Sequence, residues 1–135
     1  SKTNLLRIIH YPPLDGNEKD GAIRGAAHED INLITVLVAG TQPGLQVKDI
    51  NESWHDVSCD PGCLAINTGD MLQEASAGYF PSTTHRIINP RDNIKNVSRY
   101  SMPLFLHPRD SIKLSKKYTA REYLDERLTE IGLKG

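Results

Sequence analysis

Short runs of apolar residues, each closed by turn-forming residues, recur along most of the chain. These runs are rich in β-branched side chains or alternate apolar with polar positions, which is typical of short β-strands. We expect strands at residues 5–9, 31–38, 45–47, 54–57, 63–67, 83–88 and 100–106. The turn signals recur roughly every 8–14 residues, and no strand–helix–strand alternation is visible. This spacing predicts a mainly β fold, built as a sandwich, a jelly roll or a barrel.

The last part of the chain has a helical pattern instead. Thr119 and Glu122 have the spacing of a capping box, in which two side chains satisfy free N–H groups at a helix start. Apolar side chains then fall on one helix face at Leu124, Leu128 and Ile131. Gly132 follows as a helix-ending residue. We therefore expect a C-terminal α-helix over about residues 119–131, and one or two helical turns earlier at residues 71–77.

Length and composition limit the classes to which the protein can belong. Its 135 residues fit one domain over residues 1–135, and 38% apolar with 24% charged residues are typical of a globular protein. Because 16 basic residues nearly balance 17 acidic ones, no charge excess favours a nucleic-acid partner. No apolar segment is long enough to span a bilayer, so we expect no membrane partner. Cys59 and Cys63 are interpreted as reduced thiols, and without a signal peptide we expect a cytoplasmic location.

Two histidines and an aspartate form the most informative chemical pattern. His28 and Asp30 are two residues apart, so on an extended strand both side chains point to one side and Glu29 to the other. His85 offers a third ligand from a separate predicted strand. Two imidazoles and one carboxylate are the ligand set of non-haem iron(II) oxygenases, which keeps coordination positions open for substrates. The alternative is that each histidine is only a hydrogen-bonded, partly buried residue of the core.

A second feature weighs against that alternative. Arg99 and Ser101 begin the last predicted strand, and the period of two places them on one face. A guanidinium and a hydroxyl together are a suitable receptor for a carboxylate inside a barrel. The opposite face of this strand is also apolar, with Tyr100, Met102, Leu104 and Leu106. An apolar outer face predicts that another segment covers it.

The order of these motifs resembles the C-terminal catalytic region of the isopenicillin N synthase-like family of iron(II)- and 2-oxoglutarate-dependent oxygenases. The resemblance runs from about Leu5 to about His107. It rests on Tyr11-Pro12, His28-x-Asp30, Pro43-Gly44-Leu45-Gln46-Val47, Trp54, Asn67-x-Gly69-Asp70, His85-Arg86 and Arg99-x-Ser101, in that order. It implies a double-stranded β-helix, a relative of the jelly roll.

The resemblance also implies roles for single residues. Three residues would bind Fe(II) and form the catalytic centre, namely His28, Asp30 and His85. Three others would bind the cosubstrate 2-oxoglutarate at its distal carboxylate, namely Arg99, Ser101 and the assisting Tyr11. The implied activity couples oxidative decarboxylation of 2-oxoglutarate, with O₂, to oxidation of a small-molecule substrate. The Asn67–Asp70 segment is expected to be scaffold.

Two alternatives stay open at this point. Isopenicillin N synthase keeps the Arg-x-Ser pattern and the tyrosine but uses them on its substrate, so an oxidase that does not use 2-oxoglutarate also fits. Family members carry a largely helical N-terminal region, which we expect to be absent here, and its loss would leave an apolar face uncovered. The second alternative is therefore a metal-binding fragment without activity. The uncovered face is a candidate surface for self-association.

Overall fold

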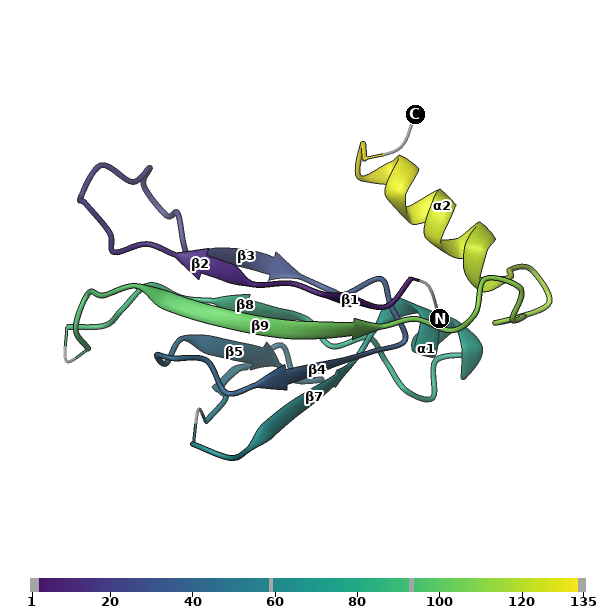
Figure 1. The fold of residues 1–135 in the computed structure, drawn as a ribbon, viewed down its shortest axis with the longest axis horizontal. Helices are drawn as coiled ribbons and strands as arrows, with labels where there is room; N and C mark the ends of the chain where they lie inside the picture. Colours follow the sequence, from purple (N-terminus) through teal and green to yellow (C-terminus); the bar gives the residue numbers. More distant parts are fainter. Residues whose placement is uncertain (1–2, 59, 93, 134–135) are drawn as a thin grey trace.

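Two antiparallel sheets form the body of the molecule (Figure 1). The computed structural model describes residues 3–58, 60–92 and 94–133. The larger sheet contains β1 (Leu5–Leu6), β2 (Ile9–Tyr11), β4 (Ile34–Val38), β7 (Leu64–Thr68) and β9 (Arg99–Leu106). The smaller sheet contains β3 (Gly25–His28), β5 (Leu45–Lys48), β6 (Trp54–Asp56) and β8 (His85–Ile87). The strand orders are β1-β9-β4-β7, with β2 also paired to β9, and β3-β8-β5-β6.

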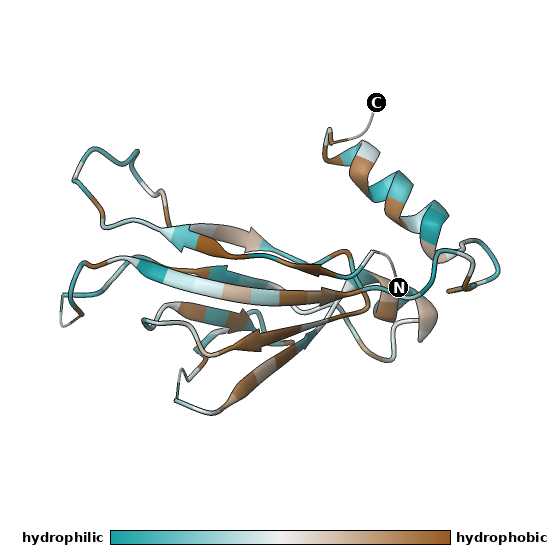
Figure 2. Cartoon of the chain, in the orientation of Figure 1, coloured by the Kyte–Doolittle hydropathy of each residue, from teal (hydrophilic) through white to brown (hydrophobic). Residues whose placement is uncertain are grey.

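The central strand β4 shows how the larger sheet divides inside from outside. Thr35 and Leu37 are buried, whereas Val38 is 50% exposed, as the period of two requires. Val38 pairs with Leu64 on one side and Met102 on the other, so apolar side chains gather on the outside of the sheet. We call this surface the outer face, and its exposed members are Val38, Leu64, Ile66 and Met102. Figure 2 shows the hydrophobic colouring of β4 and β7.

The two helices lie at one end of the sheets (Figure 1). Helix α1 (Asp70–Ala75) follows β7, and helix α2 (Ala120–Glu130) follows β9 after a loop. The predicted capping box is present, because Thr119 accepts a hydrogen bond from the Glu122 amide and the Glu122 carboxylate accepts one from the Thr119 amide. A small core joins the helices through Met71, Leu114 and Ala120, with Ile31, Leu33, Tyr123 and Leu124 packed against it. The predicted C-terminal helix is thereby confirmed.

Three features of the strands differ from the expectations. The single strand expected at residues 5–9 is two short strands, β1 and β2, which both pair with β9. The strand expected from residue 31 begins only at Ile34, because the preceding turn binds the start of α1, with the Asp70 amide donating to the Asp30 carbonyl oxygen at 2.8 Å. Strand β3 was not predicted, since its sequence Gly-Ala-Ala-His carries no β-branched residue.

Two further expectations concern single features of the chain. Within the described ranges, no helix combines the length and apolar character needed to cross a bilayer. Cys63 is a free, exposed thiol, and Cys59 lies outside the described residues.

Candidate metal centre

Two histidines from neighbouring strands and one aspartate converge between the two sheets. His28 ends β3 and lies opposite His85, which begins β8. Asp30 follows two residues after His28, where the chain has left the strand. The Oδ1 atom of Asp30 lies 3.7 Å from Nε2 of His28 and 3.6 Å from Nε2 of His85. One ligand atom of each residue lies within 4.8 Å of the other two, so all three can reach one ion.

The orientation of both imidazole rings leaves Nε2 available. Nδ1 of His28 lies 2.8 Å from the carbonyl oxygen of Ala26, and Nδ1 of His85 lies 2.9 Å from that of Thr83. A carbonyl oxygen accepts hydrogen bonds and cannot donate one, so each ring donates its proton from Nδ1. Each Nε2 therefore keeps its lone pair toward Asp30, which is the arrangement that metal-binding histidines adopt.

The Asp30 carboxylate is fixed by two polar side chains of the larger sheet. Thr35 on β4 donates to Oδ2 of Asp30 at 2.6 Å, and Asn67 on β7 donates to the same oxygen at 3.0 Å. Thr35 and Asn67 are paired across the two strands, so the register of the sheet brings both donors to one oxygen. Oδ1 is left facing the two imidazoles. These two supporting residues were missed as functional, although a buried threonine inside the apolar β4 is a signal that could have found one of them.

A close approach of two backbone segments holds Asp30 in place. A Cβ atom on Gly69 would lie 2.1 Å from the carbonyl oxygen of Asn32, so only glycine fits there. This contact lets the amide of Gly69 donate to the Leu33 carbonyl oxygen at 3.0 Å. The Asn67–Asp70 segment thus serves as scaffold, as expected, while Asn67 also contacts the aspartate.

The chemistry and surroundings of the three residues fit a divalent cation. Two neutral imidazole nitrogens and one carboxylate oxygen are ligands suited to Fe(II). The side chains of His85 and Asp30 are 14% and 5% exposed, whereas that of His28 is 56% exposed, so the centre is open on one side. It lies in a cavity of about 450 Å³ between the sheets.

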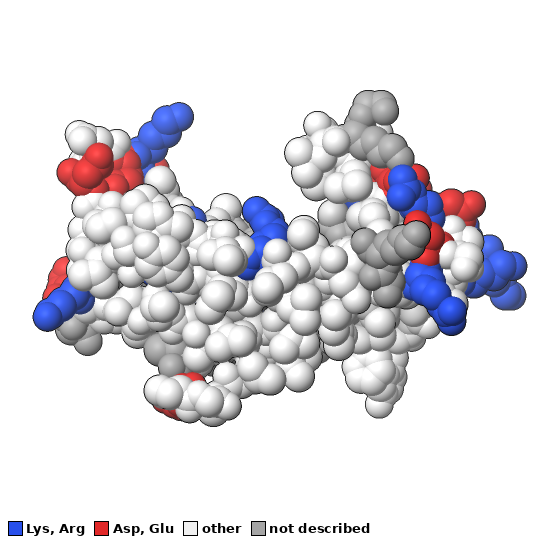
Figure 3. Space-filling model, in the orientation of Figure 1, with Lys and Arg blue, Asp and Glu red and all other residues white. Residues whose placement is uncertain are grey.

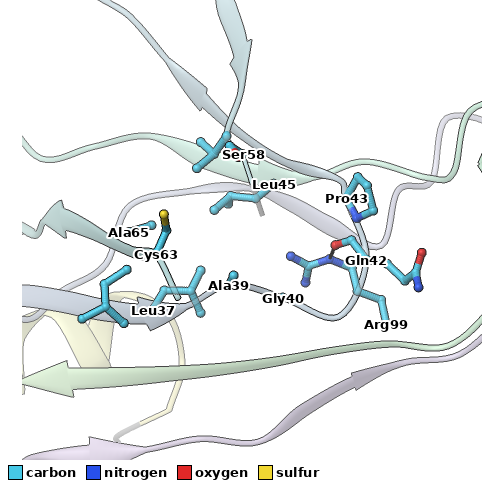
Figure 4. Close-up of a pocket in the computed structure, with 12 residues that line it drawn as sticks. Leu37, Ala39, Gly40, Gln42, Pro43, Leu45, Ser58, Cys63, Ala65 and Arg99 are labelled. Carbon is cyan, nitrogen blue, oxygen red and sulfur yellow. Dashed lines mark hydrogen bonds between the residues drawn. The ribbon is translucent and has the colours of Figure 1, made fainter. Parts of the chain in front are cut away.

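The expected carboxylate receptor lies deeper between the sheets. Arg99 and Ser101 are only 1% and 5% exposed. Nε of Arg99 donates to the Gln42 carbonyl oxygen at 3.0 Å, and its guanidinium lies 5.5 Å from the centre of the Tyr11 ring. Figure 4 shows this guanidinium extending toward Gln42, with the Cys63 thiol at the other end of the same pocket.

The six predicted site residues occupy two adjoining cavities. Ser101 and Tyr11 line the 450 Å³ cavity together with the two histidines and Asp30. Arg99 lines a neighbouring cavity of about 230 Å³. Both cavities share four apolar wall residues, namely Leu37, Leu45, Val57 and Ala65. The structure therefore brings five of the six residues into one cavity and places Arg99 in the adjoining one, with its guanidinium 5.5 Å from the centre of the Tyr11 ring.

The pKa of the Tyr11 hydroxyl lies above its ordinary value, at which the group is already protonated at neutral pH. Burial raises the pKa of this hydroxyl, while the positive charges of Arg99 and Arg7 oppose the shift. At neutral pH the hydroxyl is therefore a hydrogen-bond donor, which suits a group that faces an anionic ligand.

A sequence model of the 2OG-Fe(II) oxygenase superfamily matches residues 2–108. The chain belongs to this superfamily. It is 33% identical over 101 residues to a 2-oxoglutarate-Fe(II) type oxidoreductase of Aspergillus fumigatus, covering 74% of this chain and 29% of that protein. It is 38% identical over 103 residues to a flavonol synthase/flavanone 3-hydroxylase of Petunia hybrida, covering 76% and 27%. The chain thus spans under a third of the length of these oxygenase relatives.

Solved structures share the fold of this chain. A Shewanella oneidensis protein designated as a candidate oxygenase is 62% identical, with a TM-score of 0.86, and the match covers 98% of this chain and 49% of that protein. A full-length Neurospora crassa protein, solved in complex with alpha-KG, is 26% identical, with a TM-score of 0.82, and the match covers 95% and 44%. These likenesses confirm the predicted jelly-roll class.

Proposed function

We propose that this chain is the metal- and cosubstrate-binding core of an oxygenase that uses Fe(II), 2-oxoglutarate and O₂ to oxidise a small molecule. One observation carries the proposal, which is the convergence of Oδ1 of Asp30 with Nε2 of His28 and His85. Hydrogen bonds on the other side of each ligand fix its direction, as they do for metal-binding side chains. Membership of the superfamily supports the same assignment.

Each residue of the core has a task in this proposal. Three residues hold Fe(II), namely His28, Asp30 and His85. Arg99 and Ser101 bind the distal carboxylate of 2-oxoglutarate, because a buried guanidinium and hydroxyl satisfy a carboxylate that has left water. Tyr11 donates a further hydrogen bond and packs its ring beside Arg99. When bound, the iron, the keto acid and O₂ supply the oxidative decarboxylation to succinate and CO₂ that is coupled to substrate oxidation.

Turnover of 2-oxoglutarate tests this function directly. The purified chain, given Fe(II), 2-oxoglutarate and O₂, is expected to form succinate. Asp30→Ala is expected to abolish succinate formation, whereas Glu29→Ala, which removes the neighbouring exposed carboxylate, retains it. Oxygen uptake that is independent of 2-oxoglutarate would favour an oxidase, and metal binding without either reaction would favour an idle fragment. Both outcomes contradict the proposal.

We also propose that the chain associates with itself through the outer face. Val38, Leu64, Ile66 and Met102 form a contiguous apolar surface there, and their exposed fractions run from 40% to 65%. Burying such a surface against a second copy removes it from water. A cytoplasmic location is a further proposal, which the free, exposed thiol of Cys63 supports.

A further inference from the structure

Arg7 is placed by strand alternation on the inner side of the larger sheet. Its amide donates to the Pro103 carbonyl oxygen at 3.1 Å, between the pairs Leu5 with Phe105 and Ile9 with Ser101. Side chains that are opposite each other across two strands share a face of the sheet. The odd-numbered residues of this segment therefore face inward with Ser101, and Arg7 and Ile9 both line the metal cavity.

Arg7 also lines a second space that opens from the metal centre. This cleft, of about 890 Å³, lies between β1 and helix α2 and includes His28 and Asp30 in its lining. Apolar side chains line part of its walls, namely those of Leu5, Phe105, Leu124, Leu128 and Ile131. In the space-filling view the surface is hollowed between α2 and the loop that projects at the other end, and a basic patch lies in the hollow (Figure 3). Arg7 thus lies where the metal cavity meets the cleft.

Arg7 differs from the other arginines near the metal centre in the partners of its charged group. Arg127 in the same cleft pairs with Glu130 at 2.9 Å, and Arg99 is buried and bonded to Gln42. Within residues 3–58, 60–92 and 94–133, Arg7 forms no salt bridge, and its side chain is exposed. A cation at the mouth of a partly apolar cavity attracts an anion there.

We propose that Arg7 binds the carboxylate of the oxidised substrate, whose apolar body lies against the α2 side of the cleft. This rests on the proposed oxygenase function and adds a substrate class to it, small carboxylic acids with an aromatic or aliphatic body. One guanidinium fits one carboxylate through two parallel hydrogen bonds. The apolar stripe of α2 has a role in this arrangement, since Ile131 is 59% exposed and Leu128 only partly buried.

The position of Arg7 also separates this carboxylate from that of the cosubstrate. Arg99 lines the pocket that shares apolar wall residues with the metal cavity, whereas Arg7 lines the metal cavity itself and the cleft. Glu29, an exposed acid in the cleft lining, accepts a hydrogen bond from Thr84. Two carboxylates can therefore be held by two different arginines.

Binding of matched acids and amides to the metal-free chain tests the proposal without any turnover. The ligands are benzoate, phenylacetate, 3-phenylpropanoate and 4-phenylbutanoate, each beside its neutral primary amide, with Kd measured by calorimetry or ligand-observed NMR. At least one acid is expected to bind about tenfold more tightly than its amide, because the amide lacks the charge-assisted bonds. Arg7→Gln is expected to remove this preference, and Arg7→Lys to keep part of it. Arg109→Gln, which changes an exposed arginine that lines none of the three cavities, is expected to keep all of it.

Three results would overturn the assignment of Arg7. The first is a panel in which no acid binds more tightly than its amide. The second is an acid preference that survives in Arg7→Gln. The third is a loss of 2-oxoglutarate affinity in Arg7→Gln with unchanged binding of the aromatic acids, which would assign Arg7 to the cosubstrate. Succinate formation by the wild-type chain reports separately on the proposed function, so the two claims fail independently.

Discussion

The arrangement around Asp30 shows how single residues prepare a metal ligand. One carboxylate oxygen accepts hydrogen bonds from Thr35 and Asn67, and the other faces His28 and His85. A carboxylate held in this way keeps one rotamer, so it is oriented before any ion arrives. The hydroxyl of Thr35 also accepts a hydrogen bond from the Asn32 amide group at 3.0 Å. The ligand is therefore part of a buried polar network.

Removing the hydroxyl of Thr35 is expected to weaken metal binding. Thr35→Val keeps the shape of the side chain and removes the 2.6 Å hydrogen bond to Asp30. The affinity for Fe(II) or Co(II), measured by anaerobic titration, is expected to fall about 10- to 100-fold. Thr35→Ser, which keeps the hydroxyl, is the matched control. Equal affinity in the valine variant would show that this bond does not orient the ligand.

At the scale of elements, the start of helix α2 depends on its capping box. Thr119 and Glu122 exchange hydrogen bonds between side chains and backbone amides, with distances of 2.7 Å and 3.3 Å. Helix α2 joins the rest of the chain through a core of few residues, so its own terminal bonds matter to its stability. The helix also forms one wall of the cleft.

Truncating the cap is expected to destabilise the chain. Thr119→Ala removes the side-chain acceptor for the Glu122 amide and is expected to lower the free energy of unfolding by about 1 kcal/mol. Urea denaturation followed by circular dichroism measures this change, with Thr119→Ser as the control. A loss as large in the serine variant would assign the effect to packing rather than to capping.

The same cap predicts a dependence of stability on pH. Hydrogen bonds from the Thr119 amide and hydroxyl lower the pKa of the Glu122 carboxyl in the folded chain. The stabilisation is therefore complete above the unfolded pKa and is lost as the pH falls through the folded pKa. Wild type is expected to be more stable than Glu122→Gln at pH 7, and this difference is expected to shrink at acidic pH. A difference that is constant with pH would contradict this origin.

The sequence predicted some elements well and others poorly, for physical reasons. Strands β4 and β9 are rich in apolar residues, so their pattern alone revealed them, although β4 begins later than expected. Strand β3 has small side chains and owes its extended form to pairing with β8, which local sequence does not encode. The metal ligands were visible as residue types, whereas the support from Asn67 depends on sheet register and was not.

At the scale of the whole molecule, the two sheets enclose the candidate site and the larger one leaves its outer face open. Relatives of known structure are about twice as long as this chain, since the chain covers 49% and 44% of two of them. The apolar side chains of the outer face are opposite one another in the sheet, as Val38 and Met102 are. They form a continuous surface rather than isolated exposed residues.

Charges on the outer face are expected to prevent self-association. Val38→Lys with Met102→Lys places two cations in the surface that a second copy would bury, and burying unpaired charges is costly. Sedimentation of the wild-type chain is expected to show dimers or larger species, and the double variant is expected to dissociate at least about tenfold more readily. Ile50→Lys, at a 97% exposed position in a turn, is the control. A monomeric wild type would contradict self-association.

The most direct test of the central claim is an anaerobic titration of Fe(II) into the chain with 2-oxoglutarate, followed by visible absorption. Chelation of the keto acid to iron held by His28, Asp30 and His85 is expected to produce a charge-transfer band. The band is expected to weaken in Ser101→Ala and Arg99→Ala at fixed 2-oxoglutarate, and to vanish in Asp30→Ala, while circular dichroism confirms folding. Iron binding without a band, or an unchanged band in all three variants, would contradict the account.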